Sequence, residues 1–280
     1  MSIGVVTMSK TVLSVSMRFA LAAMIALCNP MLALADTPAG SAKGVNPAAS
    51  ADLDGATRTL TVGSDIFIGD DVITGPQGQV QILFADNTKL VVGPNSALKM
   101  QDYLLRNDGS AGKFVVDMLS GTFRFVTGNS AKNRYELNTP TGTIGVRGTK
   151  FDVSVVGKVT WILHYVGVVM LRAHGETNWT QLSDQCTLGQ ISDKSSILGN
   201  SKTIQGPMRD QLKTRFRYAN NESPLLRAFW ILPSYDCLHN PPNFTVTQYD
   251  THMNSGTPTT PPAGPVIFGV GGCGFRAVCK

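Results

Sequence analysis

Short segments with alternating apolar and polar residues dominate the sequence. Residues 79–84 (QVQILF) alternate in this way, Asp86 and Asn87 then supply a turn, and residues 88–92 form the returning arm. Asp and Asn tolerate the left-handed backbone dihedrals that tight hairpins require. Similar segments follow one another over residues 60–188, without the helix-length segments of a parallel α/β fold. This pattern predicts an all-β fold, arranged as a sandwich, a barrel or a β-solenoid.

The composition favours a folded, strand-rich domain. Charged residues make up 15% of the chain, against about 25% in typical soluble domains. Glycine is frequent, with 28 residues in 280, and both figures disfavour a long helical protein. Hydrophobic residues at 42% are enough to build a core, which disfavours a disordered chain. The net charge of +5 is small and the strands do not interleave basic with aromatic residues, so we expect no nucleic-acid partner.

The first 35 residues have the pattern of a secretory signal peptide. They contain no Asp or Glu, and Lys10 and Arg18 precede ten apolar residues at 19–28. A small-x-small pattern ends at Ala35, where we expect cleavage. The apolar run is too short to cross a bilayer of about 30 Å as a helix, which disfavours a membrane anchor. We therefore expect a periplasmic or secreted protein with no transmembrane segment in the mature chain.

The cysteines fit an oxidising compartment. Cys28 lies within the predicted signal peptide, and the large Leu27 before it disfavours lipid attachment there. Four cysteines remain in the mature chain, namely Cys186, Cys237, Cys273 and Cys279. An even number favours two disulfides, and all three pairings stay open. The four are widely scattered and include no C-x-x-C pair, so we expect no metal site. The glycine motif at 269–274 is not followed by the helix that a dinucleotide site requires, so we expect no cofactor.

Changes in composition divide the mature chain into segments. We expect a flexible lead-in at 36–58, the β domain at 59–190, a partly helical extension at 191–239, a Pro/Thr-rich linker at 240–265 and a Gly/Cys-rich patch at 266–280. The tail from 240 onward should therefore be irregular. In the extension, Pro207 and the four-residue spacing of Met208, Leu212 and Phe216 predict a helix that ends near Tyr218. A second short helix is expected over residues 224–232.

Residues that could carry catalysis lack the arrangement that catalysis requires. The four histidines include no pair four residues apart on a helix, which a zinc hydrolase would use. No nucleophile motif has its partner elements. We expect no catalytic residues, and the alternative is an enzyme with a site around Asp152, His164 and His174.

The most unusual segment covers residues 139–151 (TPTGTIGVRGTKF). Its glycines recur every three residues, and Arg147 is its only charge before Lys150. This spacing predicts a tight, glycine-bearing connection that holds Arg147 in a fixed place. The guanidinium would tie neighbouring turns together, which we favour, or bind a carboxylate of a partner. The candidate residues for these roles are Thr139, Pro140, Gly145, Arg147, Gly148, Thr149 and Phe151.

This segment and those before it resemble the FecR domain family. The resemblance covers roughly residues 60–155 and runs through matching pieces at 62–63, 69–75, 80–87, 90–97, 103, 114–119, 121–126 and 139–151. It implies an extracytoplasmic β-rich module. In full-length relatives this module belongs to a membrane regulator that relays occupancy of an outer-membrane iron transporter to a cytoplasmic sigma factor. Here a signal peptide stands where the regulator has its sigma-binding segment and membrane span.

We therefore expect a non-enzymatic binding or signalling module of the bacterial cell envelope. Its partner would be an envelope protein, bound through an exposed strand edge or loop face. The main alternative is a structural envelope protein, in which the β domain only spaces the tail.

Overall fold

The computed structural model describes residues 1, 4, 37–131 and 133–239. The predicted signal peptide, apart from two of its residues, lies outside this part of the chain. So do the predicted linker at 240–265 and the patch at 266–280, with Cys273 and Cys279.

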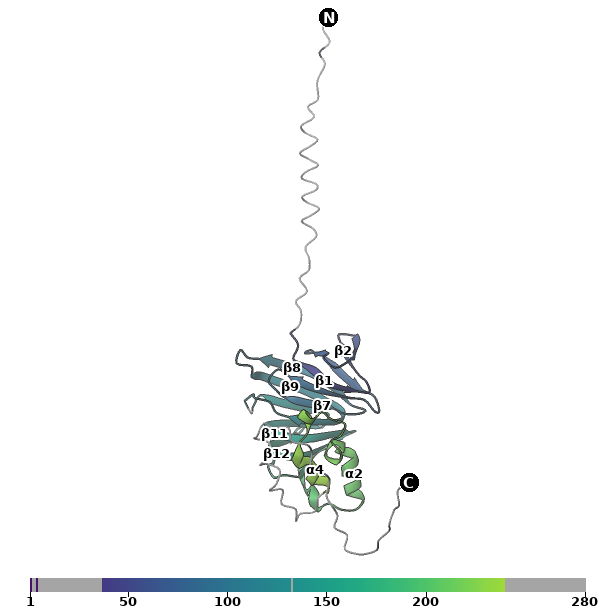
Figure 1. Ribbon diagram of the computed structural model, residues 1–280. Helices are drawn as coiled ribbons and strands as arrows, with labels where there is room; N and C mark the ends of the chain where they lie inside the picture. The colour runs from purple at the N-terminus through teal and green to yellow at the C-terminus, as the bar shows by residue number, and fades with distance from the viewer. Residues whose placement is uncertain (2–3, 5–36, 132, 240–280) are drawn as a thin grey trace, which may run out of the picture. The chain divides into compact units, whose positions relative to one another are not determined.

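The fold is all-β, as the alternating pattern predicts (Figure 1). The strands are β1 Gly40–Asn46, β2 Ala49–Leu53, β3 Ala56–Leu60, β4 Asp65–Ile66, β5 Asp71–Thr74, β6 Gln79–Phe84, β7 Lys89–Val92, β8 Ala97–Leu105, β9 Ala111–Val126, β10 Tyr135–Thr139, β11 Gly142–Val156, β12 Val159–Ala173, β13 Thr180–Leu182, β14 Thr187–Ile191 and β15 Ser195–Asn200. The helices are η1 Ser201–Thr203, α2 Pro207–Arg215, α3 Arg217–Asn220, η2 Arg227–Phe229 and α4 Leu232–His239. All strand pairs are antiparallel except β9 with β10.

The strands form two layers because the long strands β9, β11 and β12 pass through both. The first part of β9 pairs with β8 and β10, whereas its second part pairs with β7 and β11. Layer A consists of β3, β2, β5, β8, β10 and β13 with one half of each long strand. Layer B consists of β4, β1, β6, β7, β14 and β15 with the other halves. This arrangement is closest to the predicted sandwich.

Glycines with positive φ mark the places where the long strands change layer. Gly121 in β9, Gly148 in β11 and Gly167 in β12 have φ values of 103°, 68° and 87°. A Cβ on Gly167 would lie 2.0 Å from the carbonyl oxygen of Gly148, so the two bends pack backbone against backbone. The prediction of a tight connection over 139–151 is therefore wrong for most of that segment. Only its first residues form a turn, and the rest is strand β11 with a bulge at Gly148.

The two layers enclose one hydrophobic core. Phe123 and Phe125 of β9 and Phe151 of β11 are fully buried in it, and the alternating residues between them face outward. The rings of Phe84 in layer B and Phe114 in layer A meet edge to face, with centroids 4.8 Å apart. This core fixes the direction of every outward-facing residue in the long strands.

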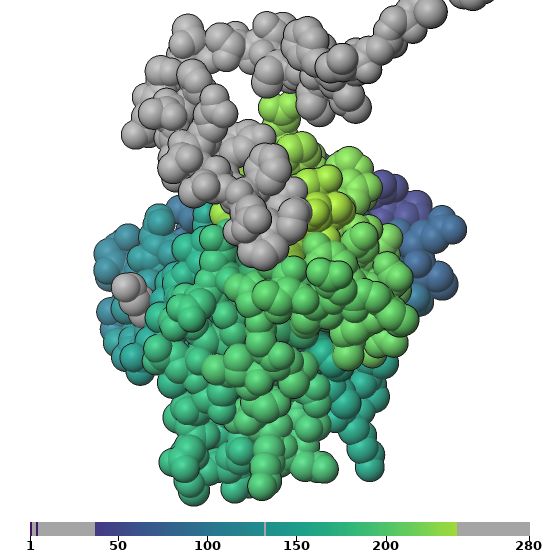
Figure 2. Space-filling model, turned by 90° about the horizontal axis from the view of Figure 1, so that it is seen from below, coloured from purple at the N-terminus to yellow at the C-terminus, as the bar shows by residue number. Residues whose placement is uncertain are grey.

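The outer face of layer B is covered by residues 201–239, which we call the cap (Figure 2). The predicted helix over 207–218 forms as α2 and α3, with a break at Phe216. The prediction of a helix over 224–232 is wrong, because that stretch contains only η2 and α4 begins at Leu232. Its backbone bonds to the sheet instead: Gln81 Oε1 accepts from the amide of Leu226, and Gln79 Nε2 donates to the carbonyl of Pro224.

The prediction of a flexible lead-in at 36–58 is also wrong. Strands β1, β2 and the beginning of β3 occupy residues 40–58. These strands pack so closely that only small side chains fit. Ala42 and Ala51 are fully buried, and a Cβ on Gly40 would lie 2.8 Å from the carbonyl oxygen of Leu83. Small side chains indicate close packing here rather than flexibility.

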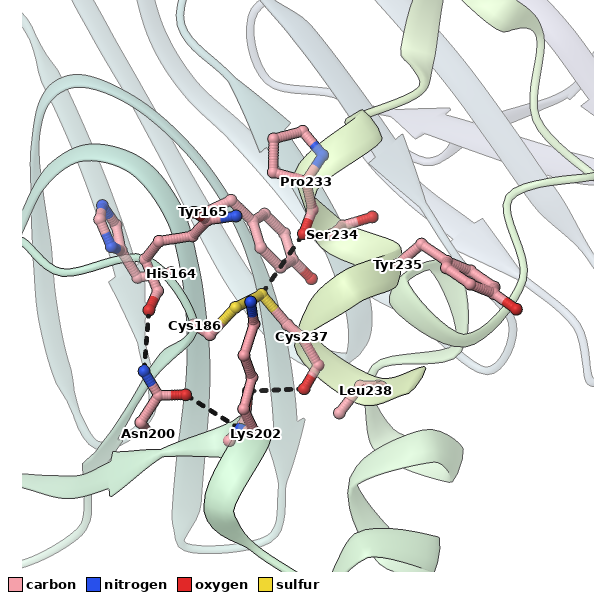
Figure 3. The surroundings of a disulfide bond; sticks show 12 residues. His164, Tyr165, Cys186, Asn200, Lys202, Pro233, Ser234, Tyr235, Cys237 and Leu238 are labelled. Carbon is pink, nitrogen blue, oxygen red and sulfur yellow. Dashed lines mark hydrogen bonds between the residues drawn. A yellow bond between two sulfur atoms is a disulfide. The ribbon is translucent and has the colours of Figure 1, made fainter. Parts of the chain in front are cut away.

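A disulfide between Cys186 and Cys237 joins layer B to α4 (Figure 3). We expect the double substitution Cys186→Ser and Cys237→Ser to lower the free energy of unfolding by about 4 kcal/mol, because a link between residues 51 positions apart restricts the unfolded chain. Urea unfolding followed by tryptophan fluorescence would measure this. Lys158→Ser, at an exposed turn position, serves as the control, and an unchanged free energy of unfolding in the double variant would contradict the prediction.

Candidate functional site

The outer face of layer A carries a groove of about 610 Å³. It crosses strands β8 to β12. The residues that line it are Leu104, Gly112, Lys113, Val115, Asn133, Arg134, Tyr135, Glu136, Thr143, Gly145, Val146, Arg147, Met170, Arg172 and Trp179. No cap residue is among them, so this face of the sheet is open among the described residues.

Strand register brings the groove residues together from distant parts of the sequence. Glu136 of β10 pairs with Val115 on one side and with Gly145 on the other. Gly145 in turn pairs with Met170 of β12. Their neighbours along each strand point into the core, so these four residues point outward and form the floor of the groove.

Gly145 leaves room for an aromatic ring in the groove. A Cβ at this position would lie 3.5 Å from the indole of Trp179 and 3.5 Å from the Cβ of Met170. The guanidinium of Arg172 lies 4.3 Å from the centroid of the same indole, a favourable cation–π distance. Trp179 is 39% exposed, which leaves part of the ring open to solvent.

The groove is strongly cationic. Four basic side chains line it, namely Lys113, Arg134, Arg147 and Arg172, against the single acidic side chain of Glu136. Lys113 forms an ion pair of 2.8 Å with Asp102, which raises the pKa of the lysine through a hydrogen bond. The side chain of Arg147 is exposed and makes no hydrogen bond or ion pair with another described residue. The Nε of Arg134 is buried and donates to no atom of the described chain.

The other residues predicted from segment 139–151 serve the fold. The Thr139 hydroxyl donates to the carbonyl of Gly142 at 2.9 Å and closes the turn that exposes Pro140. Thr149 is buried beside the bulge, and its amide donates to the Thr127 hydroxyl. Phe151 belongs to the core.

Arg147 does not tie neighbouring turns together among the described residues. Gly145 and Arg147 line the groove, whereas Gly148 provides the bend next to it. The possibility that Arg147 binds a partner's carboxylate stays a prediction.

Two buried carboxylates stabilise turns of the β domain. Asp70 accepts a bidentate pair of hydrogen bonds from Arg58 and one from the amide of Phe67. Asp86, in the hairpin turn that the sequence indicates, accepts from the hydroxyls of Thr88, Ser130 and Tyr135. These partners satisfy the two carboxylates locally, so neither is free for chemistry.

A third buried cluster lies between layer B and the cap. Arg124 donates to both oxygens of Asp152, at 2.8 and 3.0 Å, and also to Glu222 of the cap and to the Ser234 hydroxyl. Tyr165 donates to Asp152 at 2.8 Å. Burial raises the pKa of Asp152, and the charge of Arg124 opposes this shift. Burial alone would lower the pKa of Arg124, but Asp152 outweighs it and the net direction is upward.

The structure does not bring Asp152, His164 and His174 together. His164 and Tyr165 are neighbours on β12 and point to opposite sides of the strand, with Tyr165 directed towards α4 (Figure 3). Asp152 contacts Tyr165, so it lies on the side away from His164, whose Nδ1 donates to the carbonyl of Asp184 at 2.9 Å. His174 follows the end of β12 and is exposed. The described residues include no cluster of His, Cys, Asp or Glu that could hold a metal ion.

The fold and the groove define a two-layered β module with one capped face and one open face. Residues 70–169, just over a third of the chain, match the family model described as FecR protein, which confirms the resemblance seen in the sequence. The matched region contains the two buried turn carboxylates, the strand bends and most of the groove. None of the curated proteins compared with the sequence matches it.

Solved structures with some similarity include two crystal structures of a candidate anti-sigma factor from Parabacteroides distasonis ATCC 8503. They are 12% and 11% identical to this chain, with TM-scores of 0.38 and 0.39, and cover 46% and 52% of it. The chain spans 59% and 64% of their lengths. A cell surface anchoring domain is 33% identical over 24% of this chain and 88% of its own, with a TM-score of 0.23. Among the described helices, none has the length and apolar character needed to cross a bilayer.

Sequence reasoning missed several groove residues. Trp179 and Arg172 belong to none of the candidate residues predicted from the sequence. The one available signal for Arg124 is its position between two core phenylalanines, which places it on the opposite face.

We expect Arg124→Met to lower the free energy of unfolding by about 3–5 kcal/mol, because Asp152 and Glu222 would stay buried without a positive charge. Urea unfolding would measure this loss. Without Arg124 the folded-state pKa of Asp152 lies further above its unfolded value, so the loss should be smaller at pH 5 than at pH 8. Arg147→Met, at an exposed position, is the control. A loss below about 1 kcal/mol in Arg124→Met would contradict this account.

Four buried tyrosines should resist ionisation in the folded protein. The pKa values of Tyr103, Tyr135, Tyr165 and Tyr218 are raised above the usual value of 10.0, mainly by burial. Because the folded-state pKa of these tyrosines lies above the unfolded-state value, they contribute to the free energy of unfolding below pH 10. This contribution is lost as the pH rises further, because the unfolded chain releases its protons first. Absorbance at the phenolate band, followed with circular dichroism, should show these tyrosines ionising together with unfolding. Four early, independent ionisations would contradict this expectation.

Proposed function

We propose that the chain is a non-enzymatic binding or signalling module of the bacterial cell envelope, and that it acts through protein contacts made by the groove of layer A. The observation that carries this proposal is Arg147. Its guanidinium is exposed, lies in a groove and has no partner among the described residues. A charged side chain held on a strand of a packed sheet is a positioned group for recognising a second molecule.

Extracytoplasmic location is part of the proposal. The disulfide between Cys186 and Cys237 favours an oxidising compartment, and the signal-peptide pattern of residues 1–35 supports export. The FecR match favours a regulatory role over that of an inert spacer.

The test is a comparison of Arg147→Glu with Lys158→Glu. Lys158 is exposed in the turn between β11 and β12, outside the groove, so the two variants change the net charge equally. Immobilised wild-type protein should retain a saturable partner from an envelope extract of the source organism. Arg147→Glu should reduce that retention about tenfold or more through charge repulsion, while Lys158→Glu leaves it unchanged.

Circular dichroism and urea unfolding would verify that both variants fold. No saturable partner for the wild type, or equal retention by both variants, would overturn the proposal. If a partner is retained equally by Arg147→Glu and Lys158→Glu, it contacts another face of the protein. Structural spacing alone predicts that neither variant alters any interaction.

A further inference from the structure

Three basic residues lie side by side across adjacent strands at one edge of the groove. Tyr135 pairs with Phe114 and Glu136 pairs with Gly145, so extending the registers places Arg134 between Lys113 and Arg147. Neighbouring strands are about 4.8 Å apart, which gives the row a length of about 10 Å at the backbone. Like charges in directly opposite positions are destabilising. This row therefore stores an unfavourable interaction that an anionic ligand would relieve.

Counter-charges within the protein only partly neutralise this row. Asp102 pairs with Lys113, and Glu136 is the only acidic side chain that lines the groove. Arg134 keeps its buried Nε without a hydrogen bond among the described residues. A buried donor without an acceptor is unfavourable, so the described chain leaves this guanidinium incompletely satisfied.

An apolar strip lies directly beside the cationic row. It consists of Val115, Gly145 and Met170, with Glu136 between Val115 and Gly145 and the partly exposed ring of Trp179 at its end. Arg172, stacked on this ring, supplies a further cation on the far side. A ligand that fills the groove would therefore combine several negative charges with an apolar group.

Building on the function proposed above, we propose that the groove binds an extended acidic segment of the partner protein, with two or more carboxylates around an apolar side chain. Arginine binds carboxylates through paired, charge-assisted hydrogen bonds. Same-side residues of an extended chain are about 7 Å apart, so two of them fit along the row.

A nucleic acid fits this groove less well than an acidic peptide does. Glu136 points outward between Val115 and Gly145, beside the cationic row, and would repel a continuous phosphate backbone. Binding of single strands depends on several aromatic rings for base stacking. Trp179 is the only tryptophan that lines the groove, and Arg172 already covers one side of its ring.

The test uses the folded mature chain and a fluorescein-labelled peptide, Gly-Asp-Glu-Leu-Asp-Glu-Gly, measured by fluorescence anisotropy. The matched peptide has Asn and Gln in place of the acidic residues. We expect saturable binding of the acidic peptide and no binding of the matched peptide. Raising the salt concentration from 50 to 300 mM should weaken the affinity, because salt screens interactions between exposed charges. Arg134→Glu with Arg147→Glu should lower the affinity about tenfold or more, and Lys158→Glu should not change it.

Gly145→Phe gives a second reading that does not depend on charge. Its backbone φ is not positive, and a Cβ there meets only ordinary contacts, so the ring would occupy the groove in a folded protein. This variant should also lose the acidic peptide. Equal binding of both peptides, or full binding by Gly145→Phe, would overturn the inference.

Two further arms separate the sources of negative charge. Tighter binding of a twelve-residue oligothymidylate or of polygalacturonate than of the acidic peptide would overturn the choice of a peptide. If an envelope partner is retained through Arg147 but the acidic peptide neither binds nor competes, the ligand class is wrong and the proposed function stands. If no partner depends on Arg147, the proposed function fails whatever the peptide result.

Discussion

The close backbone contact between Gly148 and Gly167 determines the arrangement of the whole β domain. At this point β11 and β12 leave one layer and enter the other, and Gly121 provides the same change in β9. Any side chain at Gly167 would collide with the neighbouring backbone, since its Cβ would lie 2.0 Å from the carbonyl oxygen of Gly148. Because the strands bend here, their inward residues meet in one core and their outward residues form two separate faces.

The arginines on the two outer faces have opposite surroundings. On layer B, Arg124 is buried under the cap and neutralised by Asp152 and Glu222. On layer A, Arg134 and Arg147 face a groove that no cap residue lines. Burying unpaired charge under a cap would be very unfavourable, so the layer A face can carry its cations only while it stays open to solvent or to a ligand. The asymmetry of the cap thus separates a covered face with neutralised charges from an open, cationic face.

Much of the fold follows from the sequence, because period-two alternation is a local signal. It identifies the hairpin at Asp86 and the split between Phe123, Phe125 and Arg124 without any structure. It fails at the small residues of β1 and β2, where close packing and flexibility favour the same side chains. It also fails for the segment at 224–232, whose backbone is held by glutamines about 145 positions away.

The groove could be predicted only in part for the same reason. Segment 139–151 points to Arg147 and Gly145 through composition, whereas Arg134, Arg172 and Trp179 join them only through strand register. All four of the groove's cations thus lie on or next to strands that the core holds in place. Charged groups fixed in this way need little further ordering when a ligand binds, and this lowers the entropic cost of association. A row of like charges is unfavourable in an isolated hairpin, and the packing of both layers is what maintains it here.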